Sequence, residues 1–449
     1  MQGRHEMTNK TDSFSNRRGF IIASIGSAVG MGNLWRFPVL ISTWGGLTFL
    51  IPYIIFVVLI GSTGLVEEAA LGRSTKSGPI GAFGAATAHA GRSEKSGRRI
   101  GLVPVIGSLA LAIGYTCVVG WIFKYVFLSV TGQLYRIGDD MDSIGGLFNA
   151  TASRFGNNLW IVVAIAVTFL IMGFGVARGI ENSNKIMMPV LFAILVGLAI
   201  YIAFQPGASD GYRYIFTVDP AKLADPKLWI YAFGQAFFSL SVAGSGSVIY
   251  GSYLPEDEDI PFSAKNVAVF DTIAALLAAF VIIPAMATTG AQLNAGGPGL
   301  MFIYLLDVMN QMPAGAAVEI IFYVCVLFAG LSSLINLYEV SVATLQQEFH
   351  LGRVPAVCTI GVIGLVVSLL IQAVVSPWMD VVSTYGCPLG ALMAGVMFFW
   401  VFGKDYALQA VNRGAAHAKG DRWFFTGKYV YCGAALIALV AGAILGGIG

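Results

Sequence analysis

The sequence predicts an all-α polytopic membrane protein, because its composition, its long apolar stretches and the placement of its charges agree. Of its 449 residues, 57% are hydrophobic and only 11% are charged. Its mean hydropathy of +0.77 lies well above that of soluble globular domains. The chain therefore belongs in a lipid bilayer, and we interpret residues 1–449 as a single transmembrane domain with no separate soluble part.

Apolar stretches that are long enough to cross a bilayer recur along the whole chain. A helix needs about 20 residues to span a hydrocarbon core of roughly 30 Å. The first stretch carries no Ala-x-Ala-type cleavage site, so we interpret it as a retained helix and not as a signal peptide. We predict eleven transmembrane helices, near 17–41, 46–72, 99–132, 158–177, 186–205, 228–254, 263–290, 317–348, 354–375, 379–403 and 427–447.

The basic residues predict the orientation, because Lys and Arg near helix ends resist translocation. With the N-terminus inside, 19 of them fall at cytoplasmic ends and loops and five fall outside. We therefore expect a multi-pass protein of the bacterial inner (plasma) membrane, with a cytoplasmic N-terminus and an extracytoplasmic C-terminus. The net charge of +2, spread in this way, indicates topology and predicts no nucleic-acid partner.

Clusters of glycine and serine interrupt the first and the sixth spans, at residues 26–33 and 241–247. Unwound backbone is tolerated at membrane depth only where it lines an enclosed cavity and finds a ligand. Small residues that merely allow close helix packing are the simpler alternative. Two breaks in corresponding halves favour a secondary transporter with inverted repeats and a site at the midplane. The repeats would cover about 17–205 and 228–403, with 427–447 as an additional helix.

Residues 26–38, GSAVGMGNLWRFP, closely resemble the first-helix signature of the neurotransmitter:sodium symporter family. This resemblance implies the LeuT fold, a 5+5 inverted repeat with discontinuous helices 1 and 6, in the eleven-helix form of the shorter prokaryotic members. It also implies sodium-coupled import of an amino acid by alternating access. Further motifs agree in order and spacing: Gly45-Gly46, Ile51-Pro52-Tyr53, Glu68, Gly72-Arg73, Gly234-Gln235, Phe238-Ser239-Leu240-Ser241, Ser252-Tyr253, Ala329-Gly330-Leu331-Ser332-Ser333 and Phe398-Phe399-Trp400-Val401-Phe402-Gly403.

The resemblance implies two sodium sites built from oxygen atoms. Sodium is a hard cation that prefers about five or six oxygen ligands, which unwound carbonyl groups can supply. The simpler alternative for Ser332 and Ser333 is that each hydroxyl bonds the carbonyl one turn back. The first site would use Ala28, Asn33, Ser239, Asp271 and the substrate carboxylate, and the second would use the carbonyls of Gly26, Val29 and Ala329 with the hydroxyls of Ser332 and Ser333.

The expected substrate is a neutral amino acid that is recognised at the same breaks. Its carboxylate would meet the N–H groups of Met31 and Gly32, at the positive end of a half-helix, and the hydroxyl of Tyr115. Its ammonium group would face carbonyls near Ala28, Phe238 and Ser241. The monoamine branch of the family has an aspartate where this chain has Gly30, so the substrate should bring its own carboxylate.

The expected side-chain pocket contains no ionisable group. A charged substrate side chain would therefore stay unpaired at membrane depth, which is unfavourable. Compared with the leucine-transporting relative, Gly244 makes room and Leu111 takes some away, so we expect a medium or large apolar or aromatic side chain. The predicted lining is Met31, Leu111, Val118, Phe238, Ser241, Gly244, Ser333 and Leu337.

Two gates follow from the resemblance. Arg36 and Asp380 match the external pair, and an intramembrane arginine requires a partner. The internal pair of the family falls at Thr11 and Gln347 and cannot form a salt bridge here. The residues that could replace it are Arg17, Arg18, Asp12 and Glu348.

Asp271 predicts transport that is independent of chloride. Chloride-dependent family members have an asparagine at this position, and some bacterial relatives carry a glutamate at the position of Ala275. We expect Asp271 to supply both a sodium ligand and the compensating negative charge. The alternative is a buried aspartate with a structural partner, but the nearest basic residue, Lys265, lies nearly two helical turns away.

Classes of function other than transport have less support in the sequence. The four histidines match no metalloprotease motif, so we expect neither an enzyme nor catalytic residues. A sodium-dependent amino-acid sensor that binds without transporting stays open. So does a transporter of another small carboxylate-bearing zwitterion.

Overall fold

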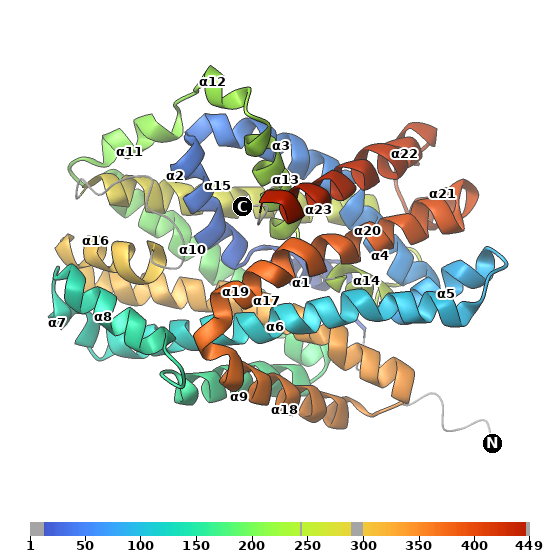
Figure 1. Ribbon diagram of the computed structural model, residues 1–449, viewed down its shortest axis with the longest axis horizontal. Helices are drawn as coiled ribbons and strands as arrows, with labels where there is room; N and C mark the ends of the chain where they lie inside the picture. The colour runs from blue at the N-terminus through green and yellow to red at the C-terminus, as the bar shows by residue number, and fades with distance from the viewer. Residues whose placement is uncertain (1–12, 243–244, 289–299, 446–449) are drawn as a thin grey trace.

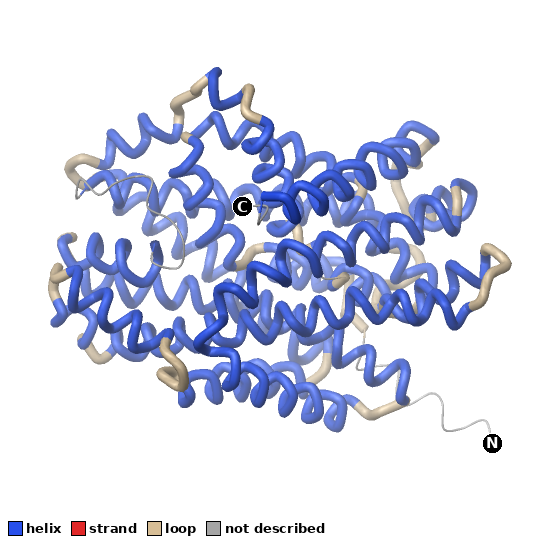
Figure 2. The backbone as a smooth tube through the Cα atoms, in the orientation of Figure 1, coloured by secondary structure: helices blue, strands red, loops and turns tan. Residues whose placement is uncertain are grey.

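The computed structural model describes residues 13–242, 245–288 and 300–445, and the regular structure in these ranges is entirely helical (Figures 1 and 2). Seven helical segments are long and apolar enough to cross a membrane. The first and sixth predicted spans are missing from this set because each is broken into short helices, and the fourth is missing because its apolar helix, Asn158–Gly173, is shorter. The seven are Gly46–Thr75, Glu94–Val130, Val176–Ala203, Ile260–Thr288, Gly315–Phe349, Arg353–Phe402, which contains the ninth and tenth predicted spans, and Asp421–Leu445.

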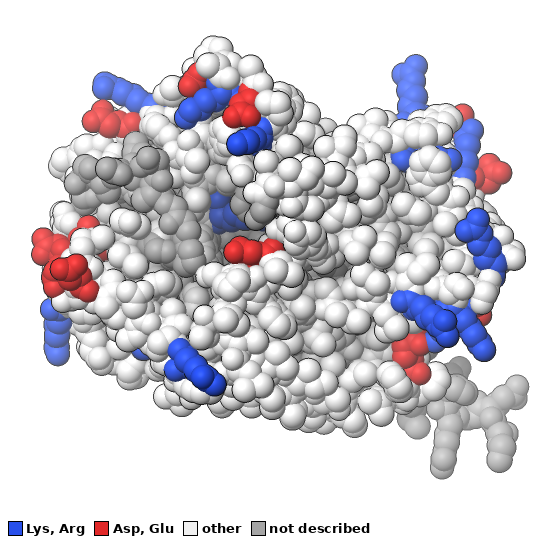
Figure 3. Space-filling model, viewed as in Figure 1, with Lys and Arg blue, Asp and Glu red and all other residues white. Residues whose placement is uncertain are grey.

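Charged side chains gather at the two ends of the long axis, and a broad band between them carries almost none (Figure 3). Large apolar side chains are exposed in these helices, including Ile106 at 63%, Leu170 at 65% and Ile437 at 64%. Such exposure is unfavourable in water and favourable in lipid. The long axis of the molecule therefore follows the membrane normal.

The first break interrupts a helix that begins with a side-chain cap. Asn16 accepts a hydrogen bond from the Gly19 N–H at 3.0 Å, and α1 spans Arg17–Ala28. Val29 then adopts an extended conformation with ψ 94°. The chain resumes as a π-type turn, η1 (Gly32–Arg36), and as α2 (Phe37–Trp44). The break therefore falls inside the predicted segment.

The second break separates α13 (Pro226–Ser239) from α14 (Gly246–Ser252). Ser241 and Ser245 have φ values of 55° and 54°, in the left-handed region that L-residues rarely occupy. Such backbone conformations persist only where the surrounding structure enforces them, and they cluster at functional sites. Ala243 and Gly244 lie outside the described residues.

Long, continuous helices surround the two breaks. The helices α6 (Glu94–Val130) and α17 (Gly315–Phe349) pack along each other, and α1 packs against α10 (Asn182–Ala203), α15 (Ile260–Thr288) and α17. Figure 1 shows α6 crossing most of the length of the molecule. The breaks are thus enclosed by protein and not by lipid.

The remaining helices complete the bundle and its ends. Next along the chain after α2 are α3 (Gly46–Ser62), α4 (Gly64–Thr75) and α5 (Pro79–His89). The others are α7 (Gln133–Ile137), α8 (Met141–Ala152), α9 (Asn158–Gly173), η2 (Val176–Glu181), α11 (Ala208–Ile215), α12 (Pro220–Leu223), η4 (Leu300–Tyr304), α16 (Leu305–Gln311), α18 (Arg353–Ile371), η5 (Gln372–Val374), α19 (Val375–Val381), η6 (Val382–Gly386), α20 (Cys387–Gly395), η7 (Val396–Phe402), α21 (Lys404–Asn412), α22 (Asp421–Phe425), η8 (Thr426–Tyr431) and α23 (Cys432–Leu445).

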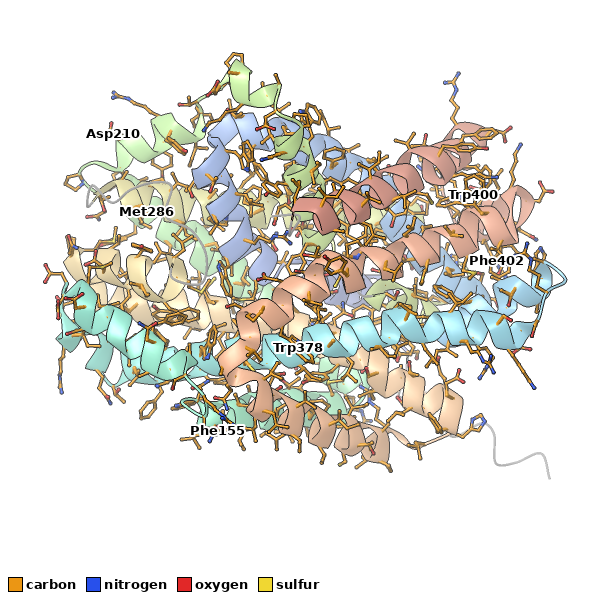
Figure 4. The ribbon with its side chains drawn as sticks, viewed as in Figure 1. Phe155, Asp210, Met286, Trp378, Trp400 and Phe402 are labelled. Carbon is orange, nitrogen blue, oxygen red and sulfur yellow. The ribbon has the colours of Figure 1, made fainter. Side chains whose placement is uncertain are left out.

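A tryptophan fixes α19 beside the middle of α6. The indole N–H of Trp378 donates to the carbonyl of Ala110 at 2.7 Å, and Figure 4 shows Trp378 where α19 meets α6. Because α19 carries Asp380 and α6 carries Tyr115, this bond links the two segments that bear these side chains.

Close packing of α4 against α14 gives a test of the fold. A Cβ on Gly72 would lie 1.9 Å from the Val248 carbonyl oxygen and 2.9 Å from the Ser252 nitrogen, both of which are backbone atoms. We therefore expect Gly72→Ala to destabilise the protein by about 1–3 kcal/mol and to lower the thermal unfolding midpoint in detergent. Gly197→Ala is the control, since a Cβ there meets nothing within 4 Å. The control should keep or raise the midpoint, and equal midpoints for the two variants would contradict this packing.

Candidate ion and substrate site

Three of the side chains predicted for the first sodium site lie together in the core. The amide nitrogen of Asn33, on η1, donates to Asp271 Oδ1 at 2.8 Å and to Ser239 Oγ at 3.1 Å. Ser239 Oγ, at the end of α13, lies 2.9 Å from both carboxylate oxygens of Asp271 on α15. All three residues are at most 1% exposed. The two broken helices and α15 therefore meet at one carboxylate.

Uncharged groups complete the surroundings of Asp271. The Tyr53 hydroxyl lies 3.5 Å from Asp271 Oδ2, and Gln235 donates to the Gly32 carbonyl at 2.9 Å. Within the described part of the chain Asp271 makes no ion pair, and Lys265 is exposed. A carboxylate buried at membrane depth without a basic partner favours a bound cation. The hydroxyl and carboxylate oxygens of Ser239 and Asp271 suit sodium. Asn33 turns its amide nitrogen toward them, and its amide oxygen accepts from the Gly30 N–H at 3.0 Å.

The residues predicted for the second sodium site also adjoin one another. A Cβ on Gly30 would stand 2.0 Å from Ser333 Oγ and 3.6 Å from the Ala329 carbonyl oxygen. A Cβ on Gly26 would stand 3.4 Å from Ser332 Cβ. The break of α1 thus lies directly against α17. The Ser332 hydroxyl donates to the Ala329 carbonyl at 3.0 Å, which is the local bond considered as the simpler alternative.

A small inner cavity of about 30 Å³ lies between the two breaks, α6 and α17. Eight residues of the predicted substrate set line this cavity, whereas Gly244 lies outside the described residues. Sequence reasoning missed Ser27, Gly246 and Asn336. Asn336 is three residues from Ser333 on one helix, so its position on the same face was a usable signal. The eight are Ala28, Gly32, Leu111, Tyr115, Phe238, Ser241, Ser333 and Leu337.

A larger outer cavity of about 410 Å³ lies on the other side of two aromatic rings. Tyr115 and Phe238 line both cavities, and their ring centroids are 6.4 Å apart. The structure places Met31 and Val118 in the outer cavity and not in the lining of the inner one. The aromatic pair is therefore the partition between the two spaces.

Arg36 and Asp380 lie on the walls of the outer cavity. The guanidinium carbon of Arg36 is 5.0 Å from the centroid of the Phe238 ring. Asp380 is exposed and Arg36 is half-buried. Figure 3 shows a hollow in this face with basic and acidic atoms on its walls. The predicted external gate pair therefore faces an open cavity above the aromatic partition.

Ion pairs close the opposite end of the bundle. Arg17 pairs with Glu258 at 3.0 Å, and Glu348 pairs with Arg98. Gln347 Oε1 accepts from the Gly78 N–H at 2.8 Å. Of the residues left open for the internal gate, Arg17 and Glu348 are thus in ion pairs and Arg18 is exposed, while Thr11 and Asp12 lie outside the described residues.

An aromatic contact and a buried ion pair reinforce this closed end. The buried ring of Phe14 lies 5.4 Å from the Tyr250 ring, edge to face. The Tyr253 hydroxyl donates to Glu339 at 2.7 Å, and Arg353 pairs with the same carboxylate at 2.5 Å. Because Phe14 precedes α1 and Tyr253 follows α14, these contacts hold both broken helices shut on this side.

Comparison with known proteins gives the same family over nearly the whole chain. The model of the sodium:neurotransmitter symporter family matches residues 11–137 and 147–445. An uncharacterized sodium-dependent transporter of Bacillus subtilis, YhdH, is 30% identical over 441 residues, which cover 94% of this chain and 95% of the relative. Another uncharacterized sodium-dependent transporter, MJ1319 of Methanocaldococcus jannaschii, is 28% identical over 439 residues, covering 92% of this chain and 86% of the relative.

A solved structure shares the fold. The crystal structure of MhsT in complex with L-phenylalanine matches with a TM-score of 0.84 and 31% sequence identity, covering 96% of this chain and 99% of MhsT. The all-helical arrangement with two broken helices is therefore that of a LeuT-fold transporter. The chain belongs to the sodium:neurotransmitter symporter family and is a sodium-dependent membrane transporter, not an enzyme.

Proposed function

We propose that this protein imports a neutral L-amino acid together with sodium across the bacterial inner membrane, by alternating access. The observation that carries the proposal is the buried Asp271, held by Asn33 and Ser239 where the two helix breaks meet. This buried carboxylate requires a cation as its partner. A substrate bound in the adjoining inner cavity would bring its own carboxylate as a second anionic ligand of that cation. Two sodium ions, at the two predicted sites, would accompany each substrate.

The pocket supports an amino acid without a charged side chain. The residues around the inner cavity carry no ionised group, and Gly30, whose Cβ would meet Ser333 Oγ, leaves no space for an acidic side chain. MhsT was crystallised with L-phenylalanine. We therefore propose a medium or large apolar or aromatic amino acid, which enters through the outer cavity and passes the ring pair Tyr115–Phe238.

The end of the bundle opposite the outer cavity is closed, which supports the interpretation that the structure is in an outward-facing state. Release into the cytoplasm would require the contacts of Phe14, the Arg17–Glu258 pair and the Glu339–Arg353 pair to separate. On the outer side, Arg36 and Asp380 would approach each other over the bound substrate. Each side would thus open only while the other is closed. In this proposal the N-terminus lies in the cytoplasm.

Counterflow in proteoliposomes tests transport against the alternative of a sensor. Vesicles loaded with unlabelled amino acid should accumulate labelled amino acid in sodium medium and not in potassium or choline medium, since the substrate and the ion bind cooperatively. A protein that binds its amino acid with sodium but never accumulates it would be a sensor. Equal binding in all three media would refute sodium coupling.

Tyr115→Phe tests the proposed contact with the substrate carboxylate. Loss of one charge-assisted hydrogen bond should weaken amino-acid binding by about 1.5–3 kcal/mol without unfolding the protein. Tyr125→Phe is the matched control, because Tyr125 is buried on the same helix and lies outside both cavities. Saturation binding in detergent compares the two variants. An affinity of Tyr115→Phe equal to that of the control would make Tyr115 a packing residue only.

Asp271→Asn tests whether this carboxylate replaces chloride. Uptake by the wild type should persist when gluconate replaces chloride, because Asp271 already supplies the negative charge beside the first ion. Asp271→Asn should lose uptake in gluconate and regain part of it when chloride is added. A wild type that stops without chloride would contradict the proposal, and so would an Asn variant that is fully active in gluconate.

A further inference from the structure

Asn184 on α10 holds a buried oxygen atom without a hydrogen-bond donor. The residue is 0% exposed, and its amide nitrogen donates to the Ile180 carbonyl at 2.9 Å. Since only the N–H side of an amide can donate to a carbonyl, this bond determines which atom is the oxygen. Within the described residues Oδ1 has no partner. A buried acceptor left without a partner is unfavourable and indicates that something fills the position.

This oxygen lies against the last turn of α1, just before the first break. A Cβ on Gly26 would lie 1.9 Å from Asn184 Oδ1, so only a glycine lets the amide come so close. The same Cβ position lies 3.4 Å from Ser332 Cβ. Asn184 therefore approaches the junction of α1 and α17 from a third helix, at the residues predicted for the second sodium site.

Several groups at the junction present oxygen atoms without a free proton. They are the carbonyls at the end of α1 and of Ala329, together with the Ser332 hydroxyl, whose proton is used at the Ala329 carbonyl. The Ser332 proton is already used, so none of these groups gives Asn184 Oδ1 a hydrogen bond, and a cation at the junction would supply the missing partner. An uncharged amide oxygen is a ligand that suits sodium, a hard cation of single charge.

We propose that Asn184 Oδ1 is a ligand of the sodium ion in the second predicted site, which would then draw its ligands from α1, α17 and α10. The inference rests on the proposed function and adds a helix to the ion site. Sodium bound at Asn184 would also affect the neighbouring segment η2, which precedes α10. Glu181 at the end of η2 accepts from the Ser15 N–H at 2.8 Å and pairs with Lys185 at 2.6 Å. Sodium at Asn184 would therefore hold the segment that anchors the N-terminal end of α1.

Sodium binding to the substrate-free protein provides the test. The full chain in detergent is titrated with sodium against choline at constant ionic strength, and two quantities are followed: the thermal unfolding midpoint and the binding of isotopic sodium. Asn184→Ala should raise the half-saturating sodium concentration about tenfold, the loss expected for one oxygen contact to a charge. Asn184→Asp keeps an oxygen ligand and adds a negative charge, so it should bind sodium more tightly than the wild type.

Asn157→Ala is the matched control, because Asn157 is 2% exposed, its side chain has no hydrogen-bond partner in the described structure, and it lies on neither predicted ion site. It should leave the sodium midpoint unchanged. If Asn184→Ala lowers the unfolding temperature equally in sodium and in choline, with an unchanged sodium midpoint, Asn184 is only structural and the inference is overturned. If Asn184→Ala does not fold, tighter sodium binding by Asn184→Asp supports the inference and unchanged or weaker binding overturns it. A wild type that binds no sodium even with amino acid present would overturn the proposed function as well.

Discussion

Backbone groups that leave a helix inside a bilayer must find partners within the protein, and this constraint organises the whole structure. The two breaks, after Ala28 and after Ser239, free carbonyl and N–H groups at the same depth. Continuous helices, above all α6 and α17, enclose the breaks so that no lipid reaches them. A cation and a zwitterion together can satisfy both kinds of group. The cation binds the carbonyl groups, and the zwitterion brings a carboxylate to the N–H groups.

Asp271 adds a charge to this arrangement. Its contacts with Asn33, Ser239 and Tyr53 are all to uncharged groups, so they orient the carboxylate without neutralising it. The same residues come from both broken helices and from α3 and α15. Occupation of the site by a cation would therefore draw four segments together, which is how binding at the centre can act on closure at the two ends.

Local sequence determined what could be predicted. Apolar length predicted the spans, and the glycine and serine clusters predicted where helices 1 and 6 break. The resemblance to the family predicted that Asn33, Ser239 and Asp271 lie together at one ion site. Met31 and Val118 lie outside the aromatic partition because the rotation of a half-helix about its axis depends on packing across the bundle, which no local pattern records. For the same reason Asn184 and the Phe14–Tyr250 contact were missed, since each joins residues that are far apart in the chain.

The central claim is that the substrate carboxylate and the first sodium ion are ligands of each other. The most direct measurement is the sodium dissociation constant of the purified protein, obtained without amino acid, with saturating amino acid and with the carboxamide analogue of that amino acid. Thermodynamic linkage requires the amino acid to tighten sodium binding by the factor with which sodium tightens amino-acid binding. With saturating amino acid, we expect the sodium dissociation constant to fall by this factor. With saturating carboxamide analogue, we expect it to stay at its value without ligand. Equal tightening by the carboxamide would contradict the account.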